Sequence, residues 1–298
     1  MSDERPIDLV RRMLAGLIGG PDTPFMERRA QVQAFADAFV LPAGLAVVQD
    51  HLGGVPVEWV IPDGAARAPV LFHLHGGGYV LGNPAGSRPF TTAFALKSGA
   101  RVVSVDYRLA PEHPFPAAVD DALTAYRALI AQGYAATRIA IGGESAGGGL
   151  TVATLLALRA AKLPLPSAAF AVSPWVDMTC NAPSFDTQAA LDPMLTRRAL
   201  KEMADAYLAG ASEHNPLASP LFGDLSELPP LLIHVGSDEV LLDDAIALHA
   251  HAAACGADST IEVWDGMIHV WHMFASLLPD GERAIDAIVD FVRAHWRS

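Results

Sequence analysis

The sequence contains little cysteine and little positive charge. Its 298 residues include two cysteines, Cys180 and Cys255, which are too few for a disulfide framework and are interpreted as reduced thiols. Lys and Arg number 20 against 33 Asp and Glu, giving a formal net charge of −13, and no stretch is rich in basic residues. We expect no nucleic-acid partner, because binding to phosphates requires clustered cations.

The sequence also lacks a long uninterrupted apolar run. No segment approaches the roughly 18 apolar residues of a membrane-spanning helix, so no stable membrane insertion is expected. The first 20 residues carry acids at Asp3, Glu4 and Asp8, and Arg11 and Arg12 interrupt their apolar part. A secretory signal peptide places basic residues first and then an unbroken apolar stretch. A cytoplasmic location is therefore the expectation.

Apolar residues are abundant, but they occur in short blocks. They make up 51% of the chain, which is enough to bury a large core. Helical periodicity predicts helices over about 89–98, 117–131, 146–161, 241–254 and 281–296. Eight runs predict strands, at 47–49, 55–61, 70–74, 102–105, 139–141, 168–172, 231–235 and 261–264. Apolar strands that alternate with helices predict an α/β fold with a mostly parallel sheet flanked by helices.

Two regions depart from this alternation. Residues 1 to about 40 predict two helices separated by Gly19-Gly20-Pro21. The interval from Ser173 to Pro230 has no strand signal and one predicted helix, over 196–208. An insertion between a strand and a helix of an α/β sheet often forms a lid over the site. The apolar face of the first predicted helix consists of Ile7, Val10, Leu14, Leu17 and Ile18.

The segment Gly143-Glu144-Ser145-Ala146-Gly147 matches the pattern G-x-S-x-G. It follows a predicted strand and opens a predicted helix, which is the context that this motif requires. Glycines on both sides of the serine allow strand and helix to approach closely. A phosphate-binding loop is the alternative, but no Gly-Lys-Ser/Thr follows. We therefore predict that Ser145 is a nucleophile.

A second motif, His75-Gly76-Gly77-Gly78, follows the strand predicted at 70–74. Attack on an ester carbonyl creates an oxyanion, and backbone N–H groups of a loop without side chains can approach it. Gly77, Gly78 and Ala146 are the predicted donors. His75 and Gly76 are expected to support the loop.

The nucleophile requires a base and an orienting acid, in the chain order Ser, acid, His. Asp238 is the preferred acid because it follows the strand at 231–235, and the adjacent Glu239 is its rival. His269 is preferred over His272 because the loop after the last strand should present it before the next helix. No histidine pair has a carboxylate at metal-ligand spacing, so no metal site is expected.

These residues predict acyl transfer, in which a serine attacks the carbonyl of a carboxylic ester. The same triad can cleave amides, so an amidase or peptidase is an alternative. A non-catalytic ligand-binding protein on the same fold is another, although His269 is present. Parallel turnover of an ester and its matching amide separates the first two.

From about residue 45 to the C-terminus, these motifs resemble the hormone-sensitive-lipase family of bacterial esterases, with the α/β-hydrolase fold. The string Asp106-Tyr107-Arg108-Leu109-Ala110-Pro111-Glu112 adds to the likeness. The resemblance implies a catalytic domain over 45–298 with an eight-stranded sheet. It also implies a helical cap from residues 1–44 and an insertion at about 176–225. Cofactor-free hydrolysis of short- to medium-chain acyl esters, lactones in some relatives, and homodimers through the last strand are further implications.

The cap would determine which acyl chain fits. The candidate pocket residues are Phe25, Met26, Phe35, Trp175, Leu191, Met194 and Tyr207. Ordinary packing between cap and core is the alternative interpretation for each of them.

Overall fold

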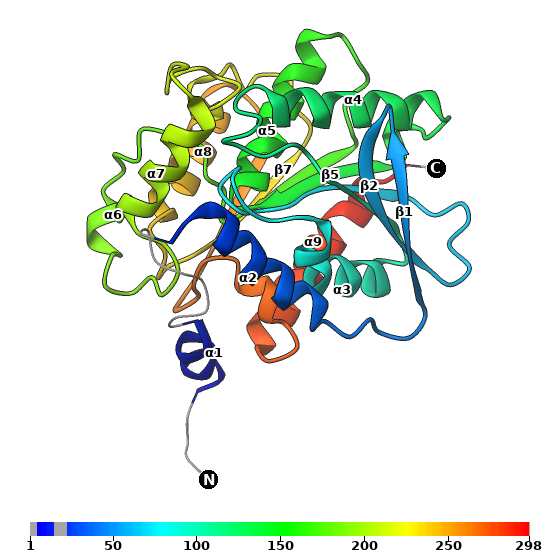
Figure 1. The fold of residues 1–298 in the computed structure, drawn as a ribbon. Coiled ribbons are helices and arrows are strands. Elements are labelled where there is room, and N and C mark those ends of the chain that lie inside the picture. Colours follow the sequence, from blue (N-terminus) through cyan, green and yellow to red (C-terminus); the bar gives the residue numbers. More distant parts are fainter. Residues whose placement is uncertain (1–4, 15–22, 298) are drawn as a thin grey trace.

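The computed structural model describes residues 5–14 and 23–297, and one eight-stranded sheet runs through it (Figure 1). The strand order is β1-β2-β4-β3-β5-β6-β7-β8. The pairings of β2 with β1 and with β4 are antiparallel, and all the others are parallel. All eight predicted strands are confirmed. They are β1 (Leu45–Leu52), β2 (Val55–Pro62), β3 (Val70–Leu74), β4 (Arg101–Val105), β5 (Ile139–Glu144), β6 (Ala168–Val172), β7 (Leu231–Gly236) and β8 (Ser259–Trp264).

Helices cover both faces of the sheet, as strands that are apolar on both sides require. On one face, α3 (Arg88–Ser98) and α9 (Pro279–His295) bury their apolar sides in a shared cluster with the strands. On the other face, α4 (Ala117–Ala131), α5 (Ala146–Ala160) and α8 (Leu242–Ala254) join the larger cluster (Figure 1). The α/β-hydrolase fold expected from the motifs is therefore confirmed.

Further helices lie outside these two layers. They are α1 (Pro6–Leu14), α2 (Phe25–Asp37), the unpredicted short helix α6 (Ser184–Thr187) and α7 (Arg197–Leu208). The apolar face of α1 packs on the segment around Trp271, whereas Leu17, Ile18 and Gly19-Gly20-Pro21 lie outside the described residues. Short 3-10 turns occupy Pro84–Ser87, Ala136–Arg138, Pro220–Phe222 and Trp271–Phe274. No described helix combines the length and the apolar character needed to cross a membrane.

The parallel strands place the predicted site residues at one edge of the sheet. Strands β3, β5, β7 and β8 are parallel neighbours or near-neighbours, so their carboxyl ends lie on the same side. The glycine loop follows β3, Ser145 follows β5, and the predicted acid and base follow β7 and β8. Segments far apart in the sequence are thereby brought together where open α/β sheets bind their ligands.

Candidate active site

Ser145 lies on a sharp turn between β5 and α5. Its φ of 58° and ψ of −121° are unusual for a residue with a side chain. The turn is held by its backbone: Ser145 N–H donates to the carbonyl of Val172 at 2.8 Å, and Ser145 O accepts from Trp175 N at 3.0 Å. Surrounding hydrogen bonds of this kind maintain a strained conformation at a functional residue.

The glycines that flank Ser145 are required by the lack of space for a side chain. A Cβ at Gly143 or at Gly147 would overlap the carbonyl oxygen of Leu74 on the neighbouring strand. The sequence-based interpretation that these glycines let strand and helix approach closely is confirmed. The turn therefore presents the Ser145 side chain at the carboxyl edge of the sheet.

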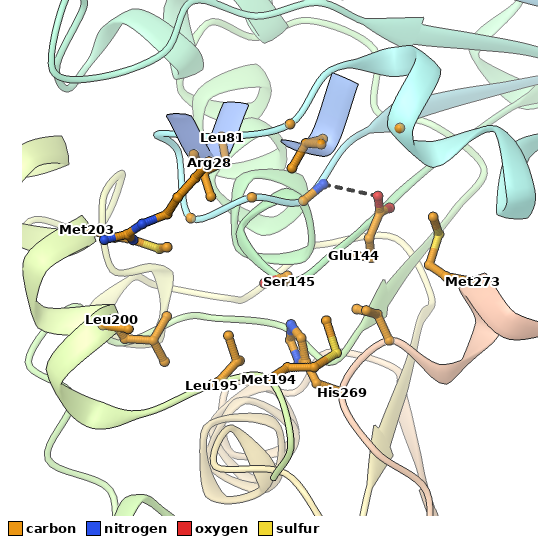
Figure 2. Close-up of a pocket in the computed structure, with 18 of the residues that line it drawn as sticks. Arg28, Leu81, Glu144, Ser145, Met194, Leu195, Leu200, Met203, His269 and Met273 are labelled. Carbon is orange, nitrogen blue, oxygen red and sulfur yellow. Dashed lines mark hydrogen bonds between the residues drawn. The ribbon is translucent and has the colours of Figure 1, made fainter. Parts of the chain in front are cut away.

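His269 lies beside Ser145 and lines the same cavity (Figure 2). The side chain is buried, and its Nδ1 lies 2.6 Å from Oε2 of Glu239. Because a carboxylate only accepts hydrogen bonds, this contact places the imidazole proton on Nδ1. Nε2 is then the nitrogen left to accept a proton from a neighbouring hydroxyl.

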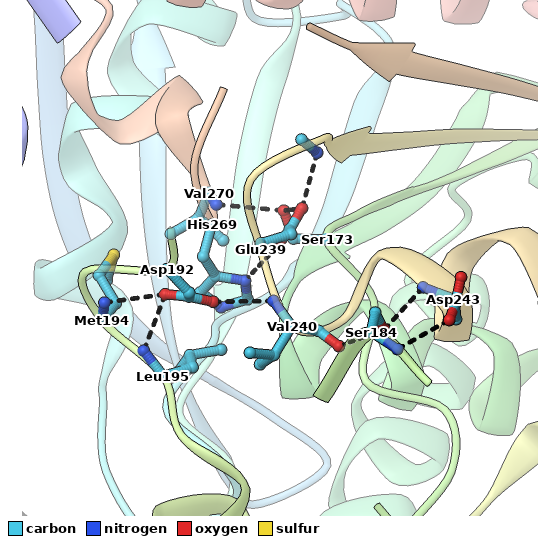
Figure 3. Close-up of polar contacts among 11 residues, drawn as sticks. Ser173, Ser184, Asp192, Met194, Leu195, Glu239, Val240, Asp243, His269 and Val270 are labelled. Carbon is cyan, nitrogen blue, oxygen red and sulfur yellow. Dashed lines mark hydrogen bonds and ion pairs between the residues drawn. The ribbon is translucent and has the colours of Figure 1, made fainter. Parts of the chain in front are cut away.

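The carboxylate that reaches His269 belongs to Glu239, and the expectation of Asp238 in this place is corrected (Figure 3). Glu239 is fully buried, and its Oε1 accepts from Gly236 N at 2.7 Å and from Ser173 Oγ at 2.8 Å. Asp238 instead pairs with Arg11 at 2.6 Å and with the neighbouring hydroxyl of Ser237. Its side chain stays 21% exposed. The two adjacent carboxylates therefore have different partners, and Glu239 is the one that contacts His269.

His272, the rival base, is packed inside the protein. Its Nε2 lies 3.1 Å from Nδ1 of His234, and its ring contacts Trp271. Burial lowers the pKa of His272 well below its ordinary value. His272 is thus a packed histidine of the interior.

The glycine loop lines the cavity opposite His269. Gly77 and Gly78 have φ values of 118° and 62°, which favour glycine. Gly76 N–H is already used, because it donates to Oε1 of Glu144 at 3.0 Å. The other predicted donor, Ala146, is the buried first residue of α5.

Glu144 connects the glycine loop to the turn at Ser145, a role that the sequence analysis did not predict. Its carboxylate contacts His73 Nε2 at 2.8 Å and accepts from Ser87 Oγ at 2.5 Å, besides holding Gly76 (Figure 2). Burial alone would raise its pKa, but the His73 charge and these hydrogen bonds outweigh it and lower the pKa of Glu144. A carboxylate inside a buried motif was the available signal, because such a group requires partners.

His75 lies beneath the loop as a neutral ring. Its Nδ1–H donates to the carbonyl of Gly76 at 2.8 Å, and the ring stacks on Tyr107 at 4.1 Å. Tyr107 in turn donates its hydroxyl to the His75 carbonyl at 2.7 Å. Burial lowers the pKa of His75 to about 4. The Tyr-Arg-Leu-Ala-Pro-Glu string therefore supports the loop from below.

The cavity between these elements has a volume of about 390 Å³. Its wall includes one buried cation, Arg28 of α2, which pairs with Glu202 of α7 at 2.8 Å. In the described chain, no group of three or more His, Cys, Asp or Glu is placed to hold a metal ion. The apolar part of the wall consists of Leu14, Val32, Leu81, Pro193, Met194, Leu195, Ala199, Leu200, Met203, Val270 and Met273.

Of the seven predicted pocket residues, Met194 lines this cavity in the described structure. Two aromatic candidates are buried elsewhere: Tyr207 stacks on Tyr79 at 3.9 Å, and Trp175 packs beside Tyr79 with its indole N–H on the Asp177 carbonyl. Large aromatic rings in a cap favour packing against the core over lining a cavity that must stay open.

The other four candidates are not among the residues that line the cavity. Phe25 packs partly against the core beneath the Arg28 guanidinium. Phe35 and Leu191 are exposed at the surface, and Met26 lines a neighbouring hollow. Helix α2 turns other residues toward the site, which α2's weak amphipathic pattern did not indicate.

Comparisons with known proteins agree with this geometry. Residues 71–273 match the family described as alpha/beta hydrolase fold. The chain is 47% identical over 265 residues to an acetyl-hydrolase of Streptomyces hygroscopicus, covering 89% of this chain and 87% of that protein. It is 35% identical to an esterase of Acinetobacter venetianus, covering 76% and 75%. A crystal structure of an esterase from the bacterial hormone-sensitive lipase family superposes with a TM-score of 0.95 at 43% identity, over the full length of both chains.

Proposed function

Because the chain belongs to the α/β-hydrolase family, among the bacterial hormone-sensitive-lipase esterases, we propose that it hydrolyses short- to medium-chain acyl esters through an acyl-enzyme on Ser145. Its relatives establish it as a carboxylesterase. The observation that carries the mechanism is one cavity lined by Ser145, His269, Gly77 and Gly78, with His269 bonded to Glu239 behind it.

In the first step, His269 Nε2 takes the proton of Ser145 Oγ while the oxygen attacks the ester carbon. The carboxylate of Glu239 keeps the Nδ1 proton in place and stabilises the positive imidazolium. The backbone N–H groups of Gly77, Gly78 and Ala146 receive the developing oxyanion. Each such donor is worth about 10²–10³ in rate.

Collapse of this intermediate breaks the bond to the alcohol, which receives its proton from His269. The second step repeats the sequence with water in place of serine. Water attacks the acyl carbon and loses its proton to His269; His269 then returns that proton to Ser145 Oγ as the bond from Oγ to the acyl carbon breaks and the acid is released. The balance of the reaction is one ester and one water converted to one acid and one alcohol.

The acyl chain is expected to lie against α2, α7 and the segment before α7, which we propose act as a cap. A volume of 390 Å³ is near the lower end for small-molecule sites, which favours short to medium acyl chains. The apolar side chains on α7, Leu200 and Met203, would contact the chain. A kinetic screen across acyl lengths and lactones tests this range, and a maximum at long chains would contradict it.

We also propose a homodimer through β8. This strand pairs with β7 on one side, and Val263 on it is about half exposed. An edge strand of this kind is open to pairing with a second copy. Light scattering of the wild type should give twice the chain mass, and Val263→Lys should shift it toward one chain mass.

The mechanism is tested by trapping the acyl-enzyme. Incubation with an activated acetyl ester, followed by acid quenching and mass spectrometry, should add one acetyl group to the peptide that contains Ser145. Ser145→Ala should lose the adduct and lower kcat by roughly 10⁴–10⁶. Near-normal turnover of Ser145→Ala would exclude Ser145 as the nucleophile.

A further inference from the structure

Asp192 lies in the loop between α6 and α7, outside the proposed triad. The residues directly after it, from Pro193 to Thr196, form part of the cavity wall. We call residues 193–196 the wall loop. The hydrogen-bond partners of Asp192 are therefore connected to the wall that would contact the acyl chain.

One oxygen of the Asp192 carboxylate bonds to the cavity wall, and the other bonds to the turn that carries Glu239 (Figure 3). Oδ1 accepts from Met194 N at 2.8 Å and from Leu195 N at 2.9 Å. Oδ2 accepts from Val240 N at 2.9 Å. All three partners are N–H donors, so the site suits a carboxylate and no group that donates.

Val240 is the residue that follows Glu239, and it is fully buried. Its carbonyl accepts from Ser184 Oγ at 2.6 Å, so its N–H and its C=O are both bonded to the insertion. The backbone on the C-terminal side of Glu239 is thus positioned by Asp192 and Ser184 and not by the sheet.

The carboxylate of Glu239 is held on its other side by Ser173. Ser173 Oγ donates to Glu239 Oε1 at 2.8 Å and accepts from Val270 N at 3.1 Å, next to His269. The wall loop, the turn that carries Glu239 and the loop that carries His269 are therefore connected by one continuous series of hydrogen bonds (Figure 3).

We propose that Asp192 is a positioning residue that couples the acyl-binding wall to the orientation of Glu239, and through it to His269. The inference rests on the proposed triad. Movement of the wall at Met194 and Leu195 is transmitted through the shared carboxylate to the backbone of the acid. A displacement of about 1 Å in a catalytic group can cost about 10²-fold in rate.

Asp192→Asn tests this coupling with almost no change in size. In the Asn side chain an NH₂ group replaces one of the two carboxylate oxygens. Since this group donates, the side chain cannot accept hydrogen bonds from both the wall loop and Val240 N–H. We expect kcat for an activated acetyl ester to fall by about 10- to 100-fold, with KM changed by less than about threefold. The downfield proton resonance of the His269–Glu239 hydrogen bond should also shift or broaden, which a purely structural role would not cause.

Asp186→Asn is the matched control. Asp186 lies in the same insertion, but its carboxylate pairs with Arg197 at the surface, where it is 73% exposed. This variant should keep wild-type kcat and the wild-type resonance. Ser184→Ala is a comparison variant: it removes the hydroxyl that bonds the Val240 carbonyl and Asp243 N, and it leaves Asp192 bonded to the wall loop and to Val240 N–H. Its kcat should therefore fall less than that of Asp192→Asn.

Unchanged kcat and an unchanged resonance in Asp192→Asn would overturn the coupling, as would a rise in KM alone. If Asp192→Asn does not fold, Asp192→Ser decides, because it removes the carboxylate that bonds both the wall loop and Val240 N–H. Reduced kcat at constant KM in that variant supports the proposal, and wild-type kcat overturns it. Glu239→Gln is measured alongside. Retained activity in Glu239→Gln would refute the triad itself, whereas its loss together with an active Asp192→Asn would refute the coupling alone.

Discussion

Replacing Glu239 by Gln should reduce kcat by about 10⁴, because the amide would move the imidazole proton of His269 from Nδ1 to Nε2. Oε1 of Glu239 accepts from Gly236 N and Ser173 Oγ. The amide oxygen must stay on that side, since an NH₂ group cannot accept from Gly236 N–H. The NH₂ then faces His269 Nδ1, and the imidazole proton moves to Nε2. That nitrogen can no longer take the proton of Ser145. A factor of 10⁴ corresponds to about 5 kcal/mol of barrier.

Asp238→Asn is the companion variant, with the same chemical change one residue earlier. Asp238 contacts Arg11 and Ser237 and remains partly exposed. An ion pair that is open to solvent contributes about 0–1 kcal/mol, so kcat should stay within about threefold of wild type.

Stopped-flow release of p-nitrophenol from p-nitrophenyl acetate measures both variants. Glu239→Gln should lose the initial burst, and Asp238→Asn should retain it. A larger loss in Asp238→Asn than in Glu239→Gln would refute the assignment, as would losses below tenfold in both.

Three further substitutions test other parts of the structure. Gly147→Ala places a methyl group against the Leu74 carbonyl and should lower the free energy of unfolding by about 3 kcal/mol in urea titrations; unchanged stability would contradict the tight turn. Met203→Ala removes a side chain from the cavity wall and should raise the ratio of kcat/KM for hexanoyl over acetyl esters by about tenfold; an unchanged ratio would place the acyl chain elsewhere. Burial raises the pKa of Asp244 to about 8, against 3.8 for an exposed carboxyl, although Val176 and Asp177 donate backbone hydrogen bonds to it. The folded state therefore holds this proton more tightly, so the associated stability is present below pH 3.8 and is lost as pH rises through 8. Melting temperatures across pH 5–9 should decline less in Asp244→Asn than in wild type, and parallel curves would contradict the shift.

The fold could be predicted because its strands are distinctive one by one. Val70–Leu74 and Ala168–Val172 are short and apolar on both faces, and both are fully buried in the sheet. The serine turn was predictable for a similar reason, since only glycine fits on either side of it. Short α6 carried too few residues for a periodic signal.

The acid could not be chosen from sequence, because Asp238 and Glu239 are adjacent and chemically alike. Their difference arises from the path of the turn, where Asp238 N–H donates to the Met267 carbonyl and Gly236 N–H captures the Glu239 carboxylate. That path is a product of tertiary packing. Chain order predicted the neighbourhood of the acid and could not predict its orientation.

The residues of the cavity wall were harder to predict than the acid, because hydrophobicity does not distinguish a residue that lines a cavity from one that packs in the core. Tyr207 and Met203 lie on the same helix, and both are buried. Met203 reaches the cavity, whereas Tyr207 stacks on Tyr79. Buried Arg28 was outside any expectation, since a cation in an apolar wall becomes understandable only with Glu202 beside it.

The position of Glu144 has a consequence for directed evolution. In the pattern G-x-S-x-G, the residue before the serine is written as free to vary. Here its carboxylate holds the backbone of Gly76 and the hydroxyl of Ser87, on the far side of the cavity from His269. A mutant library that randomises this position, in search of a better nucleophile, would also disturb the glycine loop, which in the proposed mechanism receives the substrate's carbonyl oxygen. Beneficial changes at 144 should therefore arise together with compensating changes at 73 or 87, and screens that vary one site at a time would miss them.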